Sequence, residues 1–332
     1  KRPPRRGDVD ILQCHEGTVL VREPKKKVDL TEYVQFHEFG YDDSFDESAS
    51  NLEVHRRGIH SLLINMFQGG TSTCFCFGQT ASGKTYTLFG NCGEAASSMG
   101  TEGIYLIAAR KIFEHVRDQP LGVGVSMYEI YGQKVIDLLN GHEQLTPLED
   151  GDGVLQLVGL SRHRCSTVDD FIRITDRGRA ARSTTATGAN ASSSRSHAVM
   201  GVYLLDTESE RRGGPEPVTF TPENNGEVLG KLSLIDLAGS ERGADNAETD
   251  KTTRMEGRQI NTSLLALKEV IRSLDGKRSH APFRQSRLTQ VLQESLTGEN
   301  ARTLVIACIS AVEDDCQQTL NTLRYADGLK PR

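Results

Sequence analysis

A glycine-rich stretch that ends in lysine and threonine is the first place where residue types and spacing suggest chemistry. Residues 77–87 read FGQTASGKTYT, so that Gly78 is followed after four residues by Gly83, Lys84 and Thr85. In a phosphate-binding loop of this spacing, backbone N–H groups point at phosphate oxygens and the lysine reaches the outer phosphates. Because a turn rich in Gly, Ser and Thr can match the pattern by chance, its neighbours matter. Residues 73–77 are a β-prone run, and a helix can begin after the loop, which would place positive dipole at the anion.

Two later stretches could complete such a site. Residues 232–241, LSLIDLAGSE, end an apolar strand on Asp236, where a carboxylate would hold Mg²⁺ through water, and Gly239 is free to bring its N–H against a terminal phosphate. Residues 190–197, NASSSRSH, surround Arg195 with hydroxyl groups. Each stretch alone is weak evidence, since serine-rich turns are common and strands often end in aspartate. Together with the glycine-rich loop they predict a nucleotide site.

Length and composition set limits on what this site can serve. The chain has 332 residues, of which 36% are hydrophobic, enough for a large globular domain. No apolar run approaches the roughly 18 residues of a membrane span, and no apolar stretch follows the basic start, so we expect an intracellular protein without a signal peptide. Seven scattered cysteines predict reduced thiols rather than disulfides or a zinc site. The net charge of −6 argues weakly against partners such as nucleic acid or an anionic membrane.

Predicted strands and helices alternate along the whole chain, which indicates one α/β domain. Ser50 and Glu53 form a capping-box pattern before a helix that ends at Gly69. A second helical stripe runs from Ile260 to Leu274. The segment 208–226, rich in Gly, Pro and Glu, predicts a solvent loop. Strands are expected, besides 73–77, at residues 122–131, 197–207, 231–236 and 303–312.

Taken together, these motifs resemble the kinesin motor domain. The phosphate loop, N-x-x-S-S-R-S-H and D-L-A-G-S-E occur in the family's order, followed by INTSLLAL (260–267), HAPFRQSRLT (280–289) and TLNTLRYAD (319–327). The resemblance covers residues 1–332 as a single motor domain, with the family's first strand and neck expected to lie outside this chain. It implies an α/β P-loop fold, with a mostly eight-stranded mixed sheet and three helices on each face. It also implies ATP with Mg²⁺ as nucleotide and microtubules as partner. Consistently with ATP, no Asn here is followed by Lys, as the guanine-reading motif Asn-Lys-x-Asp requires.

The resemblance also assigns roles to site residues. Lys84 neutralises the outer phosphates, Thr85 and Ser194 ligate Mg²⁺, and Asp236 holds a metal-bound water. Ser193, Ser194 and Gly239 surround the terminal phosphate. Arg195 and Glu241 form an ion pair that closes the site, and Glu241 relays the proton of the attacking water. The remaining nucleotide contacts are Gly78, Gln79, Thr80, Ala81, Ser82, Gly83, Tyr86 and Asn190, with Arg2 and Pro3 on the adenine side.

A basic surface would be needed to meet tubulin, whose surface is acidic. Residues 251–290 carry nine Lys or Arg against three Asp or Glu, although the whole chain is acidic. A run of charged residues can also be an ordinary solvent-exposed surface without a partner. In kinesins, however, the helix and loop within residues 251–290 form the microtubule-binding face. The residues expected there are Lys268, Glu269, Arg272, Lys277, Arg278, Arg284 and Arg287.

One further stretch resembles the kinesin-13 family, whose members depolymerise microtubule ends rather than walk. EPKKKVDLTEY, residues 23–33, places Lys27, Val28 and Asp29 in an expected hairpin loop, and Lys268 is followed by Glu269. By the resemblance, Lys27, Val28 and Asp29 contact tubulin. Val270 departs from the family's usual cysteine, and the 208–226 insertion has no derivable role.

Three functions therefore remain in play: an ATP-driven microtubule depolymerase, a walking kinesin and a non-catalytic microtubule-binding module. The intact phosphate-site set argues against the third. We expect a cytoplasmic protein on the microtubule cytoskeleton, including the spindle, without nucleic-acid or membrane partners. This chain is expected to be monomeric, which leaves open whether the full-length protein is a dimer.

Overall fold

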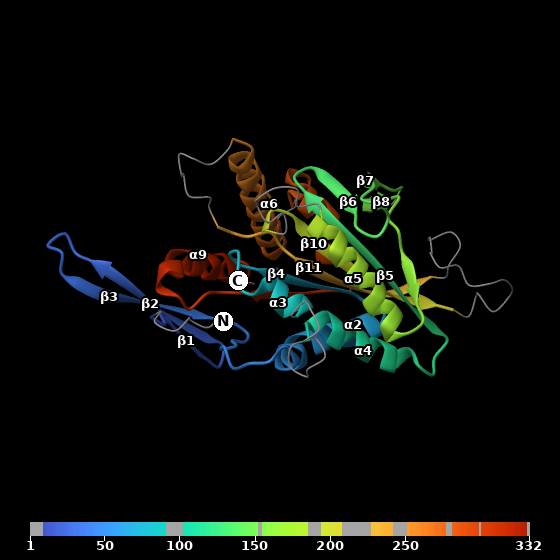
Figure 1. The fold of residues 1–332 in the computed structure, drawn as a ribbon, viewed down its shortest axis with the longest axis horizontal. Coiled ribbons are helices and arrows are strands. Elements are labelled where there is room, and N and C mark those ends of the chain that lie inside the picture. Colours follow the sequence, from blue (N-terminus) through green and yellow to red (C-terminus); the bar gives the residue numbers. More distant parts are fainter. Residues whose placement is uncertain are drawn as a thin grey trace.

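A mixed β-sheet forms the centre of the molecule in the computed structural model, which describes residues 9–90, 102–151, 155–184, 194–207, 227–241, 251–276, 281–298 and 300–330 (Figure 1). Eight strands follow one another in space. A short ninth strand, β9 (His163–Cys165), pairs with residues Val123–Val125 of β5, outside this sequence of neighbours. The spatial order is β12 (Ala301–Ala307), β4 (Thr71–Phe77), β11 (Val228–Asp236), β10 (His197–Asp206), β5 (Leu121–Tyr131), β6 (Lys134–Asp137), β7 (Gln144–Glu149) and β8 (Leu155–Val158). The mixed eight-stranded sheet predicted from the sequence is confirmed.

The register of three neighbouring strands brings the predicted motifs to one edge of the sheet. β12, β4 and β11 are parallel, and Asp236 at the end of β11 lies opposite Cys76 near the end of β4. The glycine-rich loop after β4 and the loop after β11 therefore leave the sheet at the same edge, where ligands bind in open α/β sheets. β10 is antiparallel to β11, with Ala198 opposite Asp236, so the residues that precede β10 reach this edge too.

Side chains alternate between the two faces of the sheet, and each face is covered by helices. On β4, Cys74 and Cys76 enter one hydrophobic core, whereas Phe75 and Phe77 enter the other. The first core is covered by α1 (Asn51–Val54), the π-helix η1 (His55–Ile59), α2 (His60–Phe67), α3 (Lys84–Phe89), α4 (Ile104–Val116) and α5 (Val168–Thr184). The second is covered by α6 (Lys251–Asp275), α7 (Arg287–Val291), α8 (Gln293–Thr297) and α9 (Cys316–Asp327), with short 3-10 turns η5 (Phe283–Gln285) and η6 (Glu313–Asp315) beside them.

Helices cover both faces of the described sheet, as expected for the α/β fold. On the first face α1, η1 and α2 run on without a break and are followed by α3, α4 and α5; on the second face α7 directly precedes α8, between α6 and α9. The predicted helical stripe Ile260–Leu274 lies on α6, which ends at Asp275. Within the part of the chain described here, no helix is both long and apolar enough to cross a membrane.

The last strand differs from its prediction. The apolar run 303–312 was expected to be one strand, but β12 ends at Ala307. After it, the Cys308 N–H still donates to the Phe77 carbonyl at 2.7 Å, and Ile11 N–H donates to the Ala311 carbonyl at 3.0 Å. The chain therefore leaves β4 and joins a second sheet, so its apolar side chains stay buried without continuing the strand.

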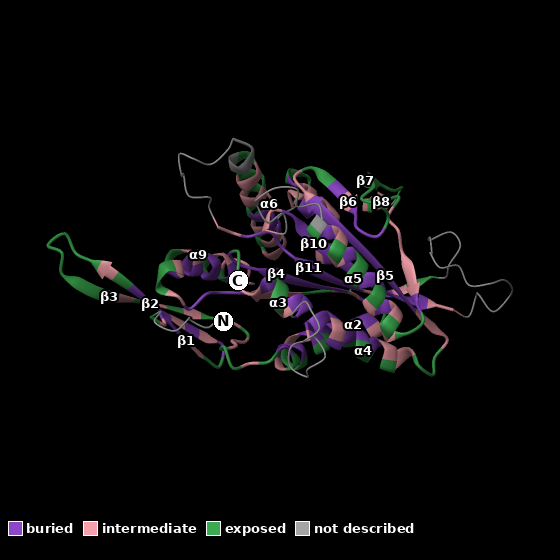
Figure 2. Cartoon of the chain, viewed as in Figure 1, coloured by how far each residue is buried: buried purple, intermediate pink, exposed green. Residues whose placement is uncertain are grey.

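That second sheet is a three-stranded antiparallel meander of β1 (Leu12–His15), β2 (Thr18–Lys26) and β3 (Glu32–Gly40). Its inner end packs Val19 and Val21 against Leu320 and Leu323 of α9. Its outer end is a β2–β3 hairpin that projects from the body (Figure 1) and is mostly exposed (Figure 2). The extended hairpin predicted around residues 23–33 is confirmed.

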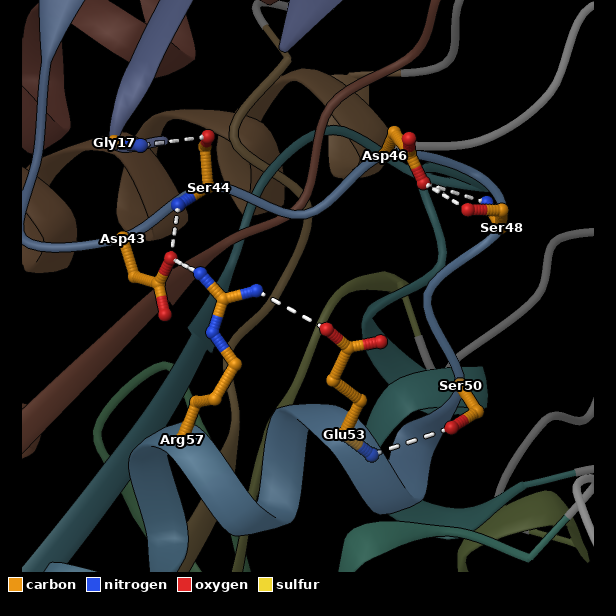
Figure 3. Close-up of polar contacts among 8 residues, drawn as sticks. All are labelled: Gly17, Asp43, Ser44, Asp46, Ser48, Ser50, Glu53 and Arg57. Atoms are coloured by element: carbon orange, nitrogen blue, oxygen red, sulfur yellow. Dashed lines mark hydrogen bonds and ion pairs between the residues drawn. The ribbon is translucent and has the colours of Figure 1, made fainter. Parts of the chain in front are cut away.

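The link from β3 to α1 is held by a chain of polar contacts (Figure 3). Ser50 caps α1, because its Oγ accepts a hydrogen bond from the Glu53 N–H at 3.2 Å, as the capping-box pattern predicts. The reciprocal half is not formed, since the Glu53 carboxylate accepts from Arg57 at 3.1 Å. Arg57 also pairs with Asp43, which ties the start of this helical segment to the link before it.

Candidate active site

The glycine-rich loop between β4 and α3 needs its glycines for backbone geometry. Gly78 has φ +147°, and a Cβ there would lie 2.1 Å from the carbonyl oxygen of Cys308. Gly83, the residue before α3, has φ +106°, in the region where an L side chain is strained. The loop therefore passes close beside the chain that follows β12 and turns sharply into a helix. This strand, loop and helix arrangement is the one that a phosphate loop requires.

Lys84 lies inside this loop. Its side chain is buried, and Nζ donates to the carbonyl oxygens of Gly78 at 2.9 Å and Gln79 at 2.8 Å. Burial lowers the pKa of Lys84, while the nearby Asp236 carboxylate acts in the opposite direction. The ammonium group is thus held among backbone dipoles at the position where phosphate oxygens would be bound.

Asp236 is the most enclosed charge of the site, with 1% of the residue exposed. Its Oδ2 accepts from the Thr85 hydroxyl at 3.0 Å and from Arg182 Nη1 at 2.8 Å. Its Oδ1 is buried and has no hydrogen-bond partner among the described residues. A carboxylate oxygen left in this way can accept a hydrogen bond from a metal-bound water, so the residues present fit Mg²⁺ held through water.

Arg182 was not identified from the sequence. It lies in the last turn of α5, is 6% exposed, and its Nη2 also donates to the Ser196 carbonyl at 3.0 Å. α5 carries three other arginines, at 173, 177 and 179, that are not buried. Nothing in the composition of the helix distinguishes the one that turns inward. The useful signal would have been position, because Arg182 is the arginine nearest to the serine-rich loop.

Backbone hydrogen bonds join the three loops at this edge of the sheet. The Gly239 N–H donates to the Ser194 carbonyl at 3.0 Å, and the Ser240 N–H donates to the Gly78 carbonyl at 3.1 Å. A Cβ on Gly239 would lie 2.5 Å from the Thr80 hydroxyl and 2.4 Å from the Glu241 carboxylate. Only glycine fits this position without displacing the charged group beside it. The structure therefore brings together the loops that the sequence analysis treated separately.

The ion pair predicted between Arg195 and Glu241 is not present in this structure. The Glu241 carboxylate instead accepts from the Thr80 N–H at 2.8 Å and from the Thr80 hydroxyl. Arg195 pairs with Glu256 of α6 through Nη1 and Oε2 at 2.6 Å, and the Tyr131 hydroxyl donates to the same carboxylate. Each charge thus finds a partner on the element next to it: Glu241 on the phosphate loop, and Arg195 on the helix that covers β10. The Tyr131 pKa rises to about 12 through burial and the Glu256 carboxylate.

His197 links the site to α6. Its Nδ1 accepts from the Ala238 N–H at 3.0 Å, so the ring proton lies on Nε2, which donates to the Ser263 hydroxyl at 2.9 Å. The Ser263 hydroxyl in turn donates to the Ile260 carbonyl at 2.7 Å. Burial lowers the pKa of His197 to about 3, so the imidazole is neutral. His197 is the last residue of the motif N-x-x-S-S-R-S-H, and no separate role was predicted for it from the sequence.

Two of the cations expected to face tubulin contact α9. Lys268 Nζ donates to the Arg324 carbonyl at 3.3 Å and lies 5.0 Å from the centre of the Tyr325 ring. Arg272 Nε donates to the Gly328 carbonyl at 3.3 Å. Both positive charges therefore lie at the C-terminal end of α9, where the helix dipole favours them. Glu269 between them is exposed.

The two remaining described cations of the expected docking face lie on η5 and α7. Arg284 is exposed and its Nη2 donates to both carboxylate oxygens of Glu149 on β7, at 3.0 and 2.8 Å. Arg287 donates to the Gln133 carbonyl at 3.3 Å and to Gln290 at 2.7 Å. Surface contacts of this kind are weak and leave the side chains available to a partner.

The tip of the β2–β3 hairpin is stabilised by its own backbone. The Leu30 N–H donates to the Lys27 carbonyl at 2.9 Å, and Asp29 Oδ1 accepts from the Thr31 N–H at 3.0 Å. That bond lowers the pKa of Asp29. Lys27 and Asp29 are exposed, and the relative exposure of Val28 reaches 105%.

Several predicted site residues lie outside the described residues, together with the whole 208–226 insertion. They are Arg2, Pro3, Asn190, Ser193, Lys277 and Arg278. Of the remaining predicted nucleotide contacts, Gln79 and Ser82 are buried, Ala81 has φ +62°, and Tyr86 is exposed. Among described residues there is no cluster of three or more His, Cys, Asp or Glu that could hold a metal ion.

Comparisons with known proteins agree with this geometry. A family profile described as the kinesin motor domain matches residues 3–331. The chain is 43% identical over 334 residues to the kinesin-like protein KIN-13B of Arabidopsis thaliana, covering 99% of this chain and 45% of that protein. It is 45% identical over 341 residues to the kinesin-like protein KIN-13A of Oryza sativa subsp. japonica, covering 99% of this chain and 40% of that protein. The chain thus spans less than half the length of these relatives.

Proposed function

This chain belongs to the kinesin motor-domain family, and we propose that it hydrolyses ATP and uses the cycle to shorten microtubules from their ends. The observation that carries the finer part of the proposal is the hairpin tip, where Val28 is fully exposed between Lys27 and Asp29 on a projecting segment. The similarity to two KIN-13 proteins supports the same assignment.

In this proposal the residues of the sheet edge bind and orient ATP. Lys84 and the backbone N–H groups of its loop bind the outer phosphates. Thr85 and Asp236 hold Mg²⁺, which neutralises phosphate charge when it is bound with the nucleotide. Asp236 would accept a metal-bound water through Oδ1, because Arg182 and Thr85 both donate to Oδ2. Arg182 would therefore hold the carboxylate in place while the water is bound.

We propose that Glu241 accepts the proton of an attacking water. Its carboxylate lies beside Gly239, whose N–H is bonded to Ser194, so it borders the space between the two loops. Glu241 is held by two donors from Thr80 and keeps further lone pairs free for a water. A carboxylate at this place can accept a proton, while Gly239 and Ser194 position the groups around the terminal phosphate.

The coupling to tubulin is proposed to run through α6. Arg195 and His197 both contact α6 directly, through Glu256 and Ser263. The same helix carries Lys268 and Arg272 on its way to the basic loop. A change in the loops around the phosphate would thus move contacts on the helix expected to face the microtubule.

The test compares the wild type with a variant in which Lys27, Val28 and Asp29 are all alanine. Stabilised microtubules are imaged with each protein and ATP, and lattice binding and basal ATPase are measured in parallel. We expect the wild type to shorten microtubules and the triple variant to lose shortening, with lattice binding and basal ATPase within about two-fold of the wild type, since exposed tip charges contribute little to folding. The matched control replaces Lys111 and Glu114, an exposed ion pair on α4, with alanine.

Three results would contradict the proposal in different ways. Directed gliding of microtubules by the wild type, without shortening, would favour a walking kinesin. Normal shortening by the triple variant would remove the tip from the mechanism. Unchanged ATPase in Glu241→Ala, where a loss of about 10²-fold or more is expected for a proton-transfer residue, would overturn the catalytic assignment.

A further inference from the structure

The four residues that follow β11 each donate a backbone hydrogen bond. Three of the acceptors are carbonyl oxygens, those of Cys76, Ser194 and Gly78. The fourth donor is the N–H of Ala238, and its acceptor is a side-chain atom, Nδ1 of His197, at 3.0 Å. A substitution at His197 can therefore remove one contact of this loop and leave the three backbone acceptors in place.

The imidazole of His197 belongs to a chain of three hydrogen bonds whose direction is fixed by its two ends. The backbone N–H of Ala238 can only donate, and the carbonyl of Ile260 at the other end can only accept. Between them, Nε2 donates to the Ser263 hydroxyl at 2.9 Å, and this hydroxyl donates to the Ile260 carbonyl at 2.7 Å. The neutral ring with its proton on Nε2 is thus the form that satisfies every group of the chain.

The Ala238 end of this chain lies out of water, beside the residue expected to meet the terminal phosphate. Ala238 is 0% exposed and His197 is 4% exposed, so the N–H has no solvent to replace a lost acceptor. The next residue is Gly239, whose N–H here donates to the Ser194 carbonyl at 3.0 Å. Because one planar peptide group joins Ala238 to Gly239, a fixed Ala238 limits the directions in which the Gly239 N–H can point.

The other end of the chain reaches α6, beside the ion pair between Arg195 and Glu256. Arg195 and His197 are two residues apart where β10 begins, so both side chains lie on the face of the sheet that α6 covers. Their partners, Glu256 and Ser263, are seven residues apart, which is about two helical turns, and lie on the same side of α6. One of these two links is charged, and the other is a neutral hydrogen bond.

We propose that His197 is a positioning residue with two separate tasks. Its Nδ1 holds Ala238, which directs the Gly239 N–H towards the terminal phosphate, and its Nε2 passes the position of this loop to α6 through Ser263. The inference rests on the proposed function, in which ATP turnover is coupled to tubulin through α6. The first task serves hydrolysis with or without a microtubule. The second serves only the acceleration of hydrolysis by microtubules, because Ser263 lies on the helix expected to face them.

A histidine that only fills space in the core is the alternative. In that case every replacement of the ring would act alike, because both nitrogens would serve only stability. Amide side chains separate the two cases: asparagine places an oxygen where Nδ1 lies, and glutamine places an NH₂ group where Nε2 lies. His197→Asn therefore keeps an acceptor for Ala238 and loses Ser263, whereas His197→Gln keeps a donor for Ser263 and loses Ala238.

The experiment measures ATPase kinetics with and without microtubules, and amide hydrogen exchange at Ala238 in the protein without nucleotide. For His197→Gln we expect faster exchange at Ala238 than in the wild type. Its kcat should fall about 10-fold both with and without microtubules, because a group that acts in the transition state is misplaced. Its KM for ATP should stay within two-fold, since the phosphate loop still binds the nucleotide. The stimulation ratio, the rate with microtubules divided by the rate without, should stay near that of the wild type.

The opposite pattern is expected for His197→Asn and for Ser263→Ala. Exchange at Ala238 should stay slow in both, and the stimulation ratio should fall about 10-fold, because the link to α6 is broken. The matched control is Ser273→Ala. Ser273 is a buried serine of α6 whose hydroxyl donates to the Glu269 carbonyl at 2.8 Å and to no other described residue. This control should match the wild type in every measurement.

Similar changes in His197→Asn and His197→Gln, in exchange or in the stimulation ratio, would overturn the inference, because the ring would then be a core residue only. A wild-type stimulation ratio in Ser263→Ala would overturn it too, and this variant keeps the ring in place if a replacement of His197 fails to fold. A wild type that microtubules do not accelerate would have the same consequence.

The proposed function is judged separately, by the shortening of microtubules. A wild type that microtubules accelerate but that does not shorten them would contradict depolymerisation, while the opposite patterns of His197→Asn and His197→Gln would still support the two tasks. Shortening by a wild type whose His197 variants behave alike would leave the proposed function and remove the inference.

Discussion

The nucleotide site and the hairpin tip differ in how far their side chains are buried and bonded within the chain. At the site, Lys84, Asp236 and Arg182 are buried, and each contacts another group of the chain within 3.0 Å. At the tip, Val28 contacts solvent on all sides, and Lys27 and Asp29 take part in the turn without packing against the body. The first region is held by internal contacts that a bound nucleotide must rearrange. The side chains of the second region contribute few contacts to the rest of the fold.

This contrast predicts where substitutions are costly. Removing one member of a buried charged pair leaves the other without compensation, whereas removing an exposed charge changes little. Changes at the site should therefore alter both stability and chemistry. Changes at the tip should alter only the encounter with a partner.

The largest effect is expected for Lys84→Ala. Because the ammonium is the buried cation inside the loop, its loss should abolish nucleotide binding and lower kcat/KM for ATP by about 10³-fold or more. Titration with a fluorescent ATP analogue checks the binding. Lys111→Ala, on the surface of α4, is the matched control. Binding within ten-fold of the wild type would show that the backbone of the loop suffices without the lysine.

Next comes Arg182→Ala, which tests the residue that the sequence analysis missed. It leaves Asp236 buried with one partner fewer, so we expect the free energy of unfolding to fall by about 3–5 kcal/mol. Thermal or urea unfolding without nucleotide measures the loss. Mg²⁺ with ATP should recover part of it, because the cation would restore a positive partner. Arg173→Ala, in an exposed pair on the same helix, should cost less than about 1 kcal/mol.

A smaller and pH-dependent effect is expected from His197. Its folded pKa of about 3 lies below the ordinary value of 6.5, so the unfolded chain binds more protons between these values. The associated stability is complete above pH 6.5 and is lost as the pH falls towards 3, by about 2 kcal/mol at pH 5. His197→Gln should flatten the slope of unfolding free energy between pH 8 and 5. An unchanged slope would assign the acid sensitivity to other groups, such as His55, whose pKa burial lowers to about 4.

The smallest effect is expected at the tip. Alanine at Lys27, Val28 and Asp29 together should change the free energy of unfolding by less than about 0.5 kcal/mol, because the substitutions are on the surface and leave the backbone hydrogen bonds of the turn in place. Urea unfolding of the triple variant beside the wild type measures this. A loss above about 2 kcal/mol would mean that the tip is a structural element, and the contrast between the regions would fail.

Local patterns were sufficient to predict much of the fold. The phosphate loop and α6 follow from glycine placement and from a stripe with helical spacing, both of which are properties of one segment. β12 was predicted too long because its apolar run continues past Ala307 into the chain beneath the second sheet. An apolar run indicates that its residues are buried, not that they form a strand. The residues after Ala307 remain buried although the strand has ended.

The partners of charged groups were harder to predict, because they depend on elements far apart in the sequence. Arg195 was expected to pair with Glu241 but contacts Glu256, and Arg182 reaches Asp236 across 54 residues. Several acids and bases are available to each of these groups. Only the packing of α5 and α6 on the sheet selects among them.

The anchoring of the hairpin also has a mechanical consequence. Beyond the Glu23 carboxylate, which is bonded to Gln317 of α9, the two strands project without support from the described body. The extended strand from Glu23 to the end of β2 at Lys26 spans about 10 Å, and the turn that holds Val28 lies beyond it. A force applied to the tip therefore acts on a ribbon that is fixed at Glu23. The resulting bending is transmitted to β2 and, through Gln317, to the start of α9. The strength of the contact between Glu23 and Gln317 determines how much of a force at the tip reaches the rest of the domain. The remainder only bends the two strands of the hairpin.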